Sequence, residues 1–291
     1  MNTNEAALEI ERLDAQSSKF QTACGPAAKM TWRRWGAGPA VVLIHGGAGS
    51  WMHWIRNIES LAQTRTVWAP DLPGFGDSDL PRDGLDADTL APYVFDGMKQ
   101  VLDGQRFDLV GFSFGGLVSA LIAAQRPAQL DRLVLVSVGA LGLLGQPPQL
   151  KSMRGIEDPR ERAEVFRFNL NALMLYGAAK VDDLAIAVQE RSAPRDRVKN
   201  RSLVLTDIML RLSQQWRCAA YGIWARQDAL YRRQIDRLCS VAGTLGLREI
   251  AILEDSGHWL QYERAEEFNR LLVRFLGEPA SRNKGSHNDD E

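Results

Sequence analysis

Short apolar runs recur along this chain, and longer segments with helical spacing separate them. The run Ala40–Ile44 is apolar at every position and rich in β-branched residues, as expected of a strand covered on both faces. Other short runs predict strands at residues 65–70, 107–110, 132–137, 219–224 and 248–253. Helical spacing is found at residues 51–63, 89–102, 117–124, 230–241 and 265–276. This alternation indicates parallel βαβ units and therefore an α/β protein.

Two parts of the chain depart from the alternation. Before the first buried run, edge strands are predicted at residues 7–13, 19–24 and 29–35, with Ser and Gly-Pro turns between them. Between about residues 139 and 216 no strand is predicted, but helices are expected at 158–175, 182–191 and 196–212. We therefore predict one α/β core, residues 1–138 and 217–278, with a helical insertion at 139–216. The insertion is expected to be a lid; the alternative is a helical module without a functional role. The polar tail, residues 279–291, is expected to be disordered.

Composition narrows the possible partners. The 35 basic and 36 acidic residues give a net charge of −1, so nothing suggests nucleic acid or an acidic membrane surface as a partner. The three cysteines show no Cys-x-x-Cys spacing, which argues against a disulfide framework or a zinc site. No signal peptide is visible, and the longest apolar run, residues 133–144, is too short to span a bilayer. We expect a soluble, cytoplasmic protein that holds no metal.

A Gly-x-Ser-x-Gly motif follows the predicted strand at 107–110 and precedes the predicted helix at 117–124. Ser113 therefore lies on a sharp strand-to-helix turn, and Gly111 and Gly115 allow the two backbone segments to approach closely. A serine hydroxyl needs a neighbouring base to become a nucleophile, and a helix N-terminus offers N–H groups to an oxyanion. The motif predicts a nucleophile elbow at Ser113. A glycine-rich packing turn is the alternative.

Four histidines could supply the base. His258 follows the last predicted strand and precedes the last helix, and open parallel sheets place their active sites at such loops. His287 lies in the tail, His53 lies within a predicted helix beside two tryptophans, and His45 ends a strand before a glycine loop. We predict that His258 is the base and that His45 and His53 have structural roles.

A carboxylate is needed to orient the histidine, and it should lie between the serine and the histidine in the chain. Asp228 follows the penultimate predicted strand, whereas the end of the strand at 132–137 offers no acid. Asp228 is therefore the predicted acid, with a surface turn as the alternative. Asp71 competes, but its Asp-Leu-Pro-Gly setting suggests a turn stabiliser.

An oxyanion formed at an attacked carbonyl needs two N–H donors. The backbone of Phe114, directly after the serine, is expected to give one. The loop from His45 to Gly49 is expected to give the other, from Gly47 first and Ala48 second. Glycines in this loop permit a close backbone approach, although packing alone could also explain them.

Together these residues resemble the α/β-hydrolase superfamily over about residues 28 to 277. The motifs that carry the resemblance are His45–Gly47, Asp71–Ser78, Gly111–Gly116, Trp224–Asp228 and Gly257–His258. The resemblance implies a mostly parallel eight-stranded sheet, a helical cap after strand six, and no cofactor. A homodimer is a further expectation drawn from the superfamily.

Within the superfamily, Gly257–Glu263 with Phe268 and Asn269 is similar to the carbon–carbon bond hydrolases of aromatic degradation. In those enzymes a cap arginine and the tryptophan after the histidine contact the substrate, which implies such roles for Arg191 and Trp259. Two features differ: Phe112 stands where that branch usually has asparagine, and the glycine loop is shorter. Both make the pocket less polar and suit a plain ester.

We therefore predict a serine hydrolase that uses neither metal nor cofactor and acts on a small carbonyl substrate. The first expectation is a 2-hydroxy-6-oxo-dienoate, bound by Arg191, Trp259 and Phe112. The alternatives are a carboxylesterase for short-acyl esters and, from another class of protein, a ligand receptor on a hydrolase scaffold.

Overall fold

The computed structural model describes residues 2–231 and 234–277. The expectation of a disordered tail at 279–291 lies outside these residues. One eight-stranded sheet has the order β1-β2-β4-β3-β5-β6-β7-β8. Its strands are β1 (Ser18–Ala23), β2 (Lys29–Trp35), β3 (Ala40–Ile44), β4 (Thr66–Pro70), β5 (Phe107–Phe112), β6 (Leu130–Val136), β7 (Ala219–Ala225) and β8 (Glu249–Leu253). Strand β2 is antiparallel to both its neighbours, and the pairs from β4 through β8 are parallel. The predicted α/β-hydrolase sheet is confirmed.

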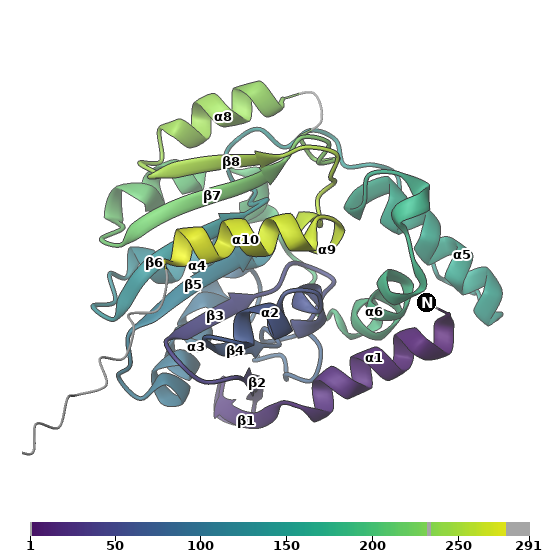
Figure 1. Ribbon diagram of the computed structural model, residues 1–291, viewed down its shortest axis with the longest axis horizontal. Helices are drawn as coiled ribbons and strands as arrows, with labels where there is room; N and C mark the ends of the chain where they lie inside the picture. The colour runs from purple at the N-terminus through teal and green to yellow at the C-terminus, as the bar shows by residue number, and fades with distance from the viewer. Residues whose placement is uncertain (1, 232–233, 278–291) are drawn as a thin grey trace, which may run out of the picture.

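Helices cover both faces of the sheet, which explains the uninterrupted apolar runs (Figure 1). Along β3, Val42 packs into one core and Val41 into the other. The first core contains residues of α3 (Ala87–Leu102), α4 (Phe114–Ala124) and α8 (Ile235–Gly243). The second contains residues of α2 (Ile58–Ala62), α9 (Leu260–Glu263) and α10 (Ala265–Leu276).

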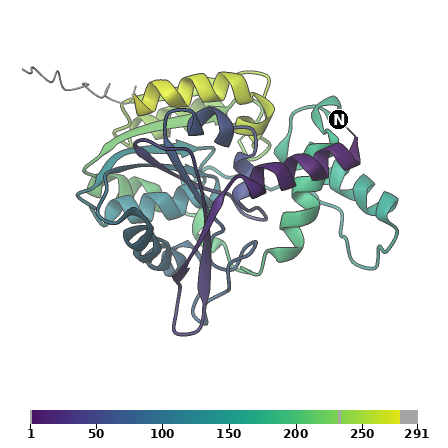
Figure 2. The ribbon, with the colours of Figure 1, turned by 60° about the horizontal axis from the view of Figure 1, so that its bottom comes forward.

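The predicted strand at residues 7–13 is wrong, because this segment is the helix α1 (Thr3–Ala15). Leu8 is exposed, and the buried residues Ala6, Ile10 and Leu13 follow helical spacing. A capping box starts the helix: the Asn2 side chain accepts from Glu5 N–H, and the Glu5 carboxylate accepts from Asn2 N–H. Helix α1 packs beside α6 (Asp183–Ser192) at one end of the sheet (Figure 2).

The helix predicted at 51–63 forms in two pieces, the 3-10 turn η1 (Trp51–Trp54) and α2. Residues 139–216, called the cap segment from here on, lie between β6 and β7 and contain no strand. Their helical elements are α5 (Pro159–Asn169), the π-helix η2 (Leu170–Met174), η3 (Ala178–Lys180), α6, η4 (Ala193–Arg195), η5 (Ser202–Leu205), α7 (Ile208–Leu212) and η6 (Ser213–Gln215).

The continuous helix predicted at 196–212 is wrong, since only η5 and α7 form there. Backbone groups before η5 bond to loops of the core instead of continuing a helix. Arg197 N–H donates to Gly74 O at 2.9 Å, and the Asp196 carboxylate accepts from Ala48 N–H at 3.1 Å. Within the described residues, no helix is both long and apolar enough to cross a membrane.

Candidate active site

Ser113 lies between β5 and α4 with φ 52° and ψ −118°, an unusual backbone conformation for a residue with a side chain. The sharp turn brings neighbouring backbone very close. A Cβ on Gly115 would overlap the His45 carbonyl oxygen, and one on Gly111 would overlap the Ser119 hydroxyl. Both glycines of the motif are therefore required by close packing around the serine, as the sequence predicted.

Three side chains far apart in the sequence form one hydrogen-bonded array. His258 Nε2 lies 2.9 Å from Ser113 Oγ, and His258 Nδ1 lies 2.7 Å from Asp228 Oδ2. Asp228 is fully buried, and its other oxygen accepts from Leu230 N–H at 2.9 Å. The distances suit the tautomer in which Nδ1–H donates to the carboxylate and Nε2 accepts from the serine hydroxyl. In this arrangement His258 can take the proton of Ser113 during attack on a carbonyl.

The sheet explains how the three residues meet. Ser113 follows β5, Asp228 follows β7 and His258 follows β8, which are parallel strands. Their carboxyl ends lie at the same edge of the sheet, where open α/β folds place their sites.

The two rival histidines have structural partners. The His45 ring bridges the Gly46 carbonyl at 2.8 Å and the Leu72 N–H at 2.9 Å. His53 Nδ1 accepts from Gly46 N–H at 3.2 Å. Burial lowers the pKa of His45 and lowers the pKa of His53 further, so both rings stay neutral. The predicted packing roles agree with these contacts.

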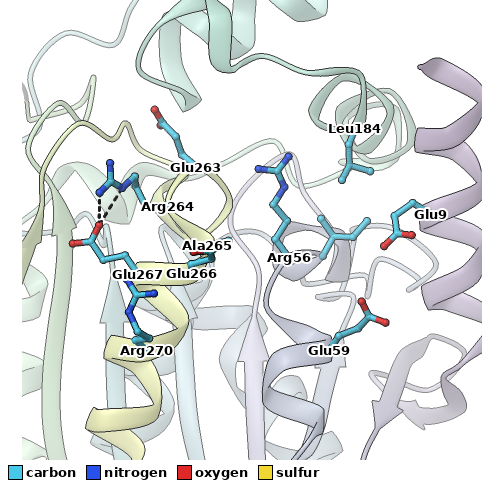
Figure 3. A pocket seen from close by; sticks show the side chains of 11 residues that line it. Glu9, Arg56, Glu59, Leu184, Glu263, Arg264, Ala265, Glu266, Glu267 and Arg270 are labelled. Atoms are coloured by element: carbon cyan, nitrogen blue, oxygen red, sulfur yellow. Dashed lines mark hydrogen bonds and ion pairs between the residues drawn. The ribbon is translucent and has the colours of Figure 1, made fainter. Parts of the chain in front are cut away.

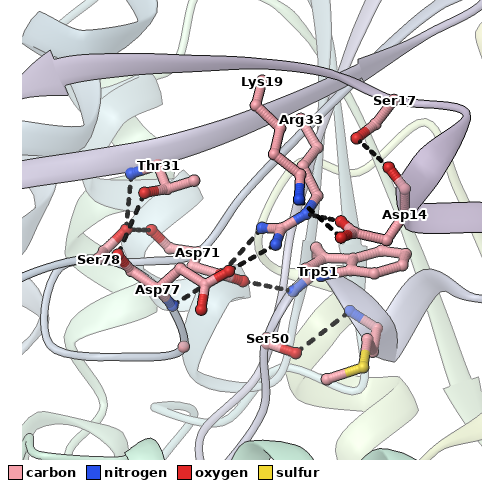
Figure 4. Close-up of polar contacts among 12 residues, drawn as sticks. Asp14, Ser17, Lys19, Thr31, Arg33, Ser50, Trp51, Asp71, Asp77 and Ser78 are labelled. Atoms are coloured by element: carbon pink, nitrogen blue, oxygen red, sulfur yellow. Dashed lines mark hydrogen bonds and ion pairs between the residues drawn. The ribbon is translucent and has the colours of Figure 1, made fainter. Parts of the chain in front are cut away.

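The rival carboxylate Asp71 belongs to the turn after β4. It accepts from Trp51 N–H at 2.8 Å and Asp77 N–H at 3.0 Å, and pairs with buried Arg33 at 3.2 Å (Figure 4). Asp71 thus stabilises the turn, as its sequence context suggested.

The glycine loop lies directly against the serine. A Cβ on Gly46 would stand 3.1 Å from Ser113 Cβ. Phe114, the other predicted donor, is the first residue of α4, where helix N–H groups are free of intrahelical partners. Ala48 N–H is already bound by Asp196 at 3.1 Å, which favours Gly47 over Ala48 as the second donor.

Two predicted substrate contacts are deeply packed side chains. Phe112 is buried with its ring centroid 5.1 Å from that of His258. Trp259 is fully buried, stacks on Tyr262 at 4.1 Å, and donates its indole N–H to His53 O at 2.9 Å. Phe112 is thus beside the triad, whereas the polar group of Trp259 is already bound within the protein.

Arg191 is not brought to the serine. Its guanidinium pairs with Glu11 of α1 at 3.1 Å and is partly exposed. Within the described residues, no hydrogen bond or ion pair joins Arg191 to Ser113 or His258.

A different cap arginine, Arg201, reaches the glycine loop. Its Nε would lie 3.3 Å from a Cβ on Gly47, and its guanidinium stands 5.6 Å from the Phe114 ring centroid. One amino group pairs with Asp196, while Nε is buried without a hydrogen-bond partner among the described residues. Sequence reasoning missed Arg201, because it is one of several arginines between residues 191 and 201 and carries no motif.

Residues 2–231 and 234–277 contain no cluster of three or more His, Cys, Asp or Glu side chains suited to a metal ion.

An eight-stranded sheet of this order, with a serine at the turn from β5 to α4, defines the class of α/β hydrolases. Residues 41–271 match the alpha/beta hydrolase family, and the chain belongs to that family of hydrolytic enzymes.

Among curated relatives, the chain is 31% identical over 265 residues to a 2-hydroxy-6-oxononadienedioate/2-hydroxy-6-oxononatrienedioate hydrolase of Cupriavidus pinatubonensis, covering 83% of this chain and 88% of the relative. It is 27% identical to a 2-hydroxy-6-oxo-6-phenylhexa-2,4-dienoate hydrolase of Comamonas testosteroni, with the same coverage. These relatives confirm the resemblance to the carbon–carbon bond hydrolases.

Solved structures share the fold. A carboxylesterase from Bacillus subtilis superimposes with a TM-score of 0.71 at 17% identity, covering 94% of this chain and 98% of the other. A meta-cleavage product hydrolase from Pseudomonas fluorescens IP01 gives a TM-score of 0.64 at 22% identity, covering 86% and 94%.

Proposed function

We propose that this enzyme cleaves a carbon–carbon bond in a 2-hydroxy-6-oxo-dienoate, with Ser113 as nucleophile, His258 as base and acid, and Asp228 as the residue that orients the imidazole. The observation that carries the proposal is the continuous hydrogen-bonded array from Asp228 through His258 to Ser113. The relatives that act on dienoates support the substrate class.

In this mechanism Ser113 Oγ adds to the keto carbon, and His258 takes the serine proton. The carbonyl oxygen becomes an oxyanion held by Phe114 and Gly47 N–H groups. When the oxyanion collapses, the neighbouring carbon–carbon bond breaks. This cleavage requires the keto form of the substrate, in which the 2-hydroxyl has lost its proton and C5 has gained one. The electron pair of the broken bond then moves through the conjugated fragment to the C2 carbonyl oxygen, and the resulting dienolate takes a proton from the His258 imidazolium. Water then hydrolyses the acyl-serine with His258 again as base.

A carbon leaving group needs a cation to stabilise its developing charge or to bind its carboxylate. Arg191 was the predicted cation, but its partner is Glu11. The unpartnered Nε–H of Arg201 beside Gly47 favours Arg201 for this role.

A carboxylesterase acting on short-acyl esters is the second candidate. The apolar Phe112 ring beside His258 favours it, because an uncharged ester needs no polar group at that position. Both candidates use the same triad and differ in the leaving group.

The test uses a yellow ring-cleavage dienoate and p-nitrophenyl acetate in parallel. The first candidate predicts rapid bleaching of the dienoate by the wild-type enzyme, and the second predicts turnover of the acetate alone. Ser113→Ala should lower either activity by at least about a thousandfold. An active Ser113→Ala variant would refute the triad mechanism, and single-turnover labelling without steady turnover would instead indicate a receptor.

A further inference from the structure

Glu263, the last residue of α9, is a buried carboxylate outside the triad. Its side chain is 1% exposed. It accepts from Gly257 N–H at 2.8 Å and from Tyr176 N–H at 3.1 Å, and it pairs with Lys180 Nζ at 2.8 Å. A buried charge with this many partners is costly to disturb, because removing one partner leaves others unpaired.

The three partners belong to two different regions. Gly257 directly precedes His258 in the loop after β8, whereas Tyr176 and Lys180 belong to the cap segment. Figure 3 shows the Glu263 side chain directed towards the cap and away from the Arg264–Glu267 pair. The carboxylate therefore joins the histidine loop to the cap segment.

Backbone contacts also connect the histidine loop to the cap segment. Trp259 N–H donates to Met174 O at 2.7 Å, at the end of the π-helix η2. A Cβ on Gly257 would stand 2.9 Å from Met174 O, Leu175 C and Tyr176 N, so only glycine fits against the cap backbone there. Lys180 also donates to Asp255 O on the same loop.

These contacts fix the backbone on both sides of His258. The residues before and after it, Gly257 and Trp259, both donate their backbone N–H groups. Gly257 donates to the Glu263 carboxylate, and Trp259 donates to Met174 O of the cap segment. The backbone that carries the imidazole is thus fixed partly by cap docking. Misplacement of a catalytic group by about 1 Å can cost roughly a hundredfold in rate.

We propose that Glu263 is a positioning residue for His258, which makes alignment of the imidazole with Ser113 dependent on docking of the cap segment through Lys180 and Tyr176. This inference rests on the proposed triad but not on the identity of the substrate.

The test measures how fast a fluorophosphonate probe labels Ser113, since that rate depends on activation of the serine and not on substrate recognition. Glu263→Gln should slow labelling and lower kcat by about tenfold to a hundredfold, with KM changed less than about threefold. Lys180→Met should lower both rates in the same direction by a smaller factor, and Lys180→Arg should restore them.

Glu267→Gln is the matched control, because Glu267 lies on the adjacent helix α10 and pairs with Arg264 at 2.7 Å, at the surface. The probe should label Glu267→Gln at the wild-type rate, and this variant should turn over substrate at the wild-type rate. If Glu263→Gln does not fold, the labelling rates of Lys180→Met and Lys180→Arg test the inference in its place. Wild-type labelling rates in both Glu263→Gln and Lys180→Met would overturn the inference while leaving the triad intact. A wild-type enzyme whose Ser113 is not labelled would instead overturn the proposed function.

Discussion

The α/β core and the cap segment both contribute to the surroundings of Ser113, but different interactions hold them in place. In the core, Asp228 and His258 are almost completely buried and follow strands whose side chains pack on both faces. The cap segment reaches the catalytic loops through charged side chains: Asp196 accepts from Ala48 N–H, and Lys180 pairs with Glu263.

The exposed fractions differ accordingly. The Lys180 side chain is 38% exposed and that of Arg201 is 30% exposed, whereas the Asp228 side chain is 0% exposed. The Lys180 end of the pair with Glu263 is open to water, so that ion pair alone does not fix the cap, and the contact of the same carboxylate with Tyr176 N–H adds to it. From this difference we expect substitutions in the core to abolish bond cleavage, and substitutions in the cap segment to change alignment and substrate preference.

The largest expected effect comes from the core. Asp228→Asn should lower kcat by about a thousandfold to ten-thousandfold, because an amide does not hold the histidine in the required tautomer. Steady-state hydrolysis of p-nitrophenyl acetate measures it. Asp236→Asn is the matched control, since Asp236 lies nearby on α8 and its side chain is 96% exposed. Loss of less than tenfold in Asp228→Asn would mean that Asp228 does not orient the base.

A substitution in the cap segment is expected to have a smaller effect on activity, limited to one class of substrate. Arg201→Gln should lower kcat/KM for a dienoate by about tenfold to a hundredfold, because a charge-assisted contact to the anionic substrate is lost. Turnover of the neutral p-nitrophenyl acetate should change less than about threefold.

Arg191→Gln provides the contrast, since its guanidinium pairs with Glu11. Both activities should remain near wild type in this variant. The opposite pattern, with the dienoate lost in Arg191→Gln and kept in Arg201→Gln, would return the role to the arginine expected from the family resemblance and would imply that the cap rearranges on binding.

The same contrast explains what sequence could predict. Ser113, Asp228 and His258 each follow an apolar run, and parallel strands end at one edge of the sheet, so local pattern and chain order were enough to bring them together. The bounds of β3 followed from its apolar run and were predicted to the residue. The bounds of β2 were also predicted to the residue, but β2 was expected at an edge and lies between β1 and β4.

The structure of the cap segment was harder to predict from the sequence, for a physical reason. Residues 196–201 are tied to the core by Asp196 and Arg197, and such long-range contacts leave no periodic signal. The position of Arg201 beside Gly47 follows from that tertiary arrangement. For α1 a local signal does exist, the Asn2–Glu5 capping box, although an edge strand was predicted at residues 7–13.

The smallest expected effect tests the neutral histidines behind the serine. Burial lowers the pKa of His45 and, more strongly, of His53, so the unfolded chain binds protons that the folded protein does not. Their contribution to stability is therefore complete above the unfolded histidine pKa of about 6.5 and is lost as pH falls below it towards their folded pKa values. Within that window, each such histidine should lower the free energy of unfolding by on the order of 1.4 kcal/mol for every pH unit of acidification. This corresponds to a fall of about 2–4 °C in Tm.

His53→Asn isolates this contribution, because an asparagine oxygen can still accept from Gly46 N–H but does not titrate. Thermal melts of wild type and variant at pH 8 and pH 5.5 measure the difference. The variant should be less stable than wild type at pH 8, since the packing of the ring against Phe112 and Trp259 is lost. It should lose less Tm on acidification. Equal losses of Tm in the two proteins would mean that His53 takes up its proton as readily in the folded core as in the unfolded chain. The low-dielectric surroundings of the triad would then be less complete than the burial of Phe112 and Trp259 implies.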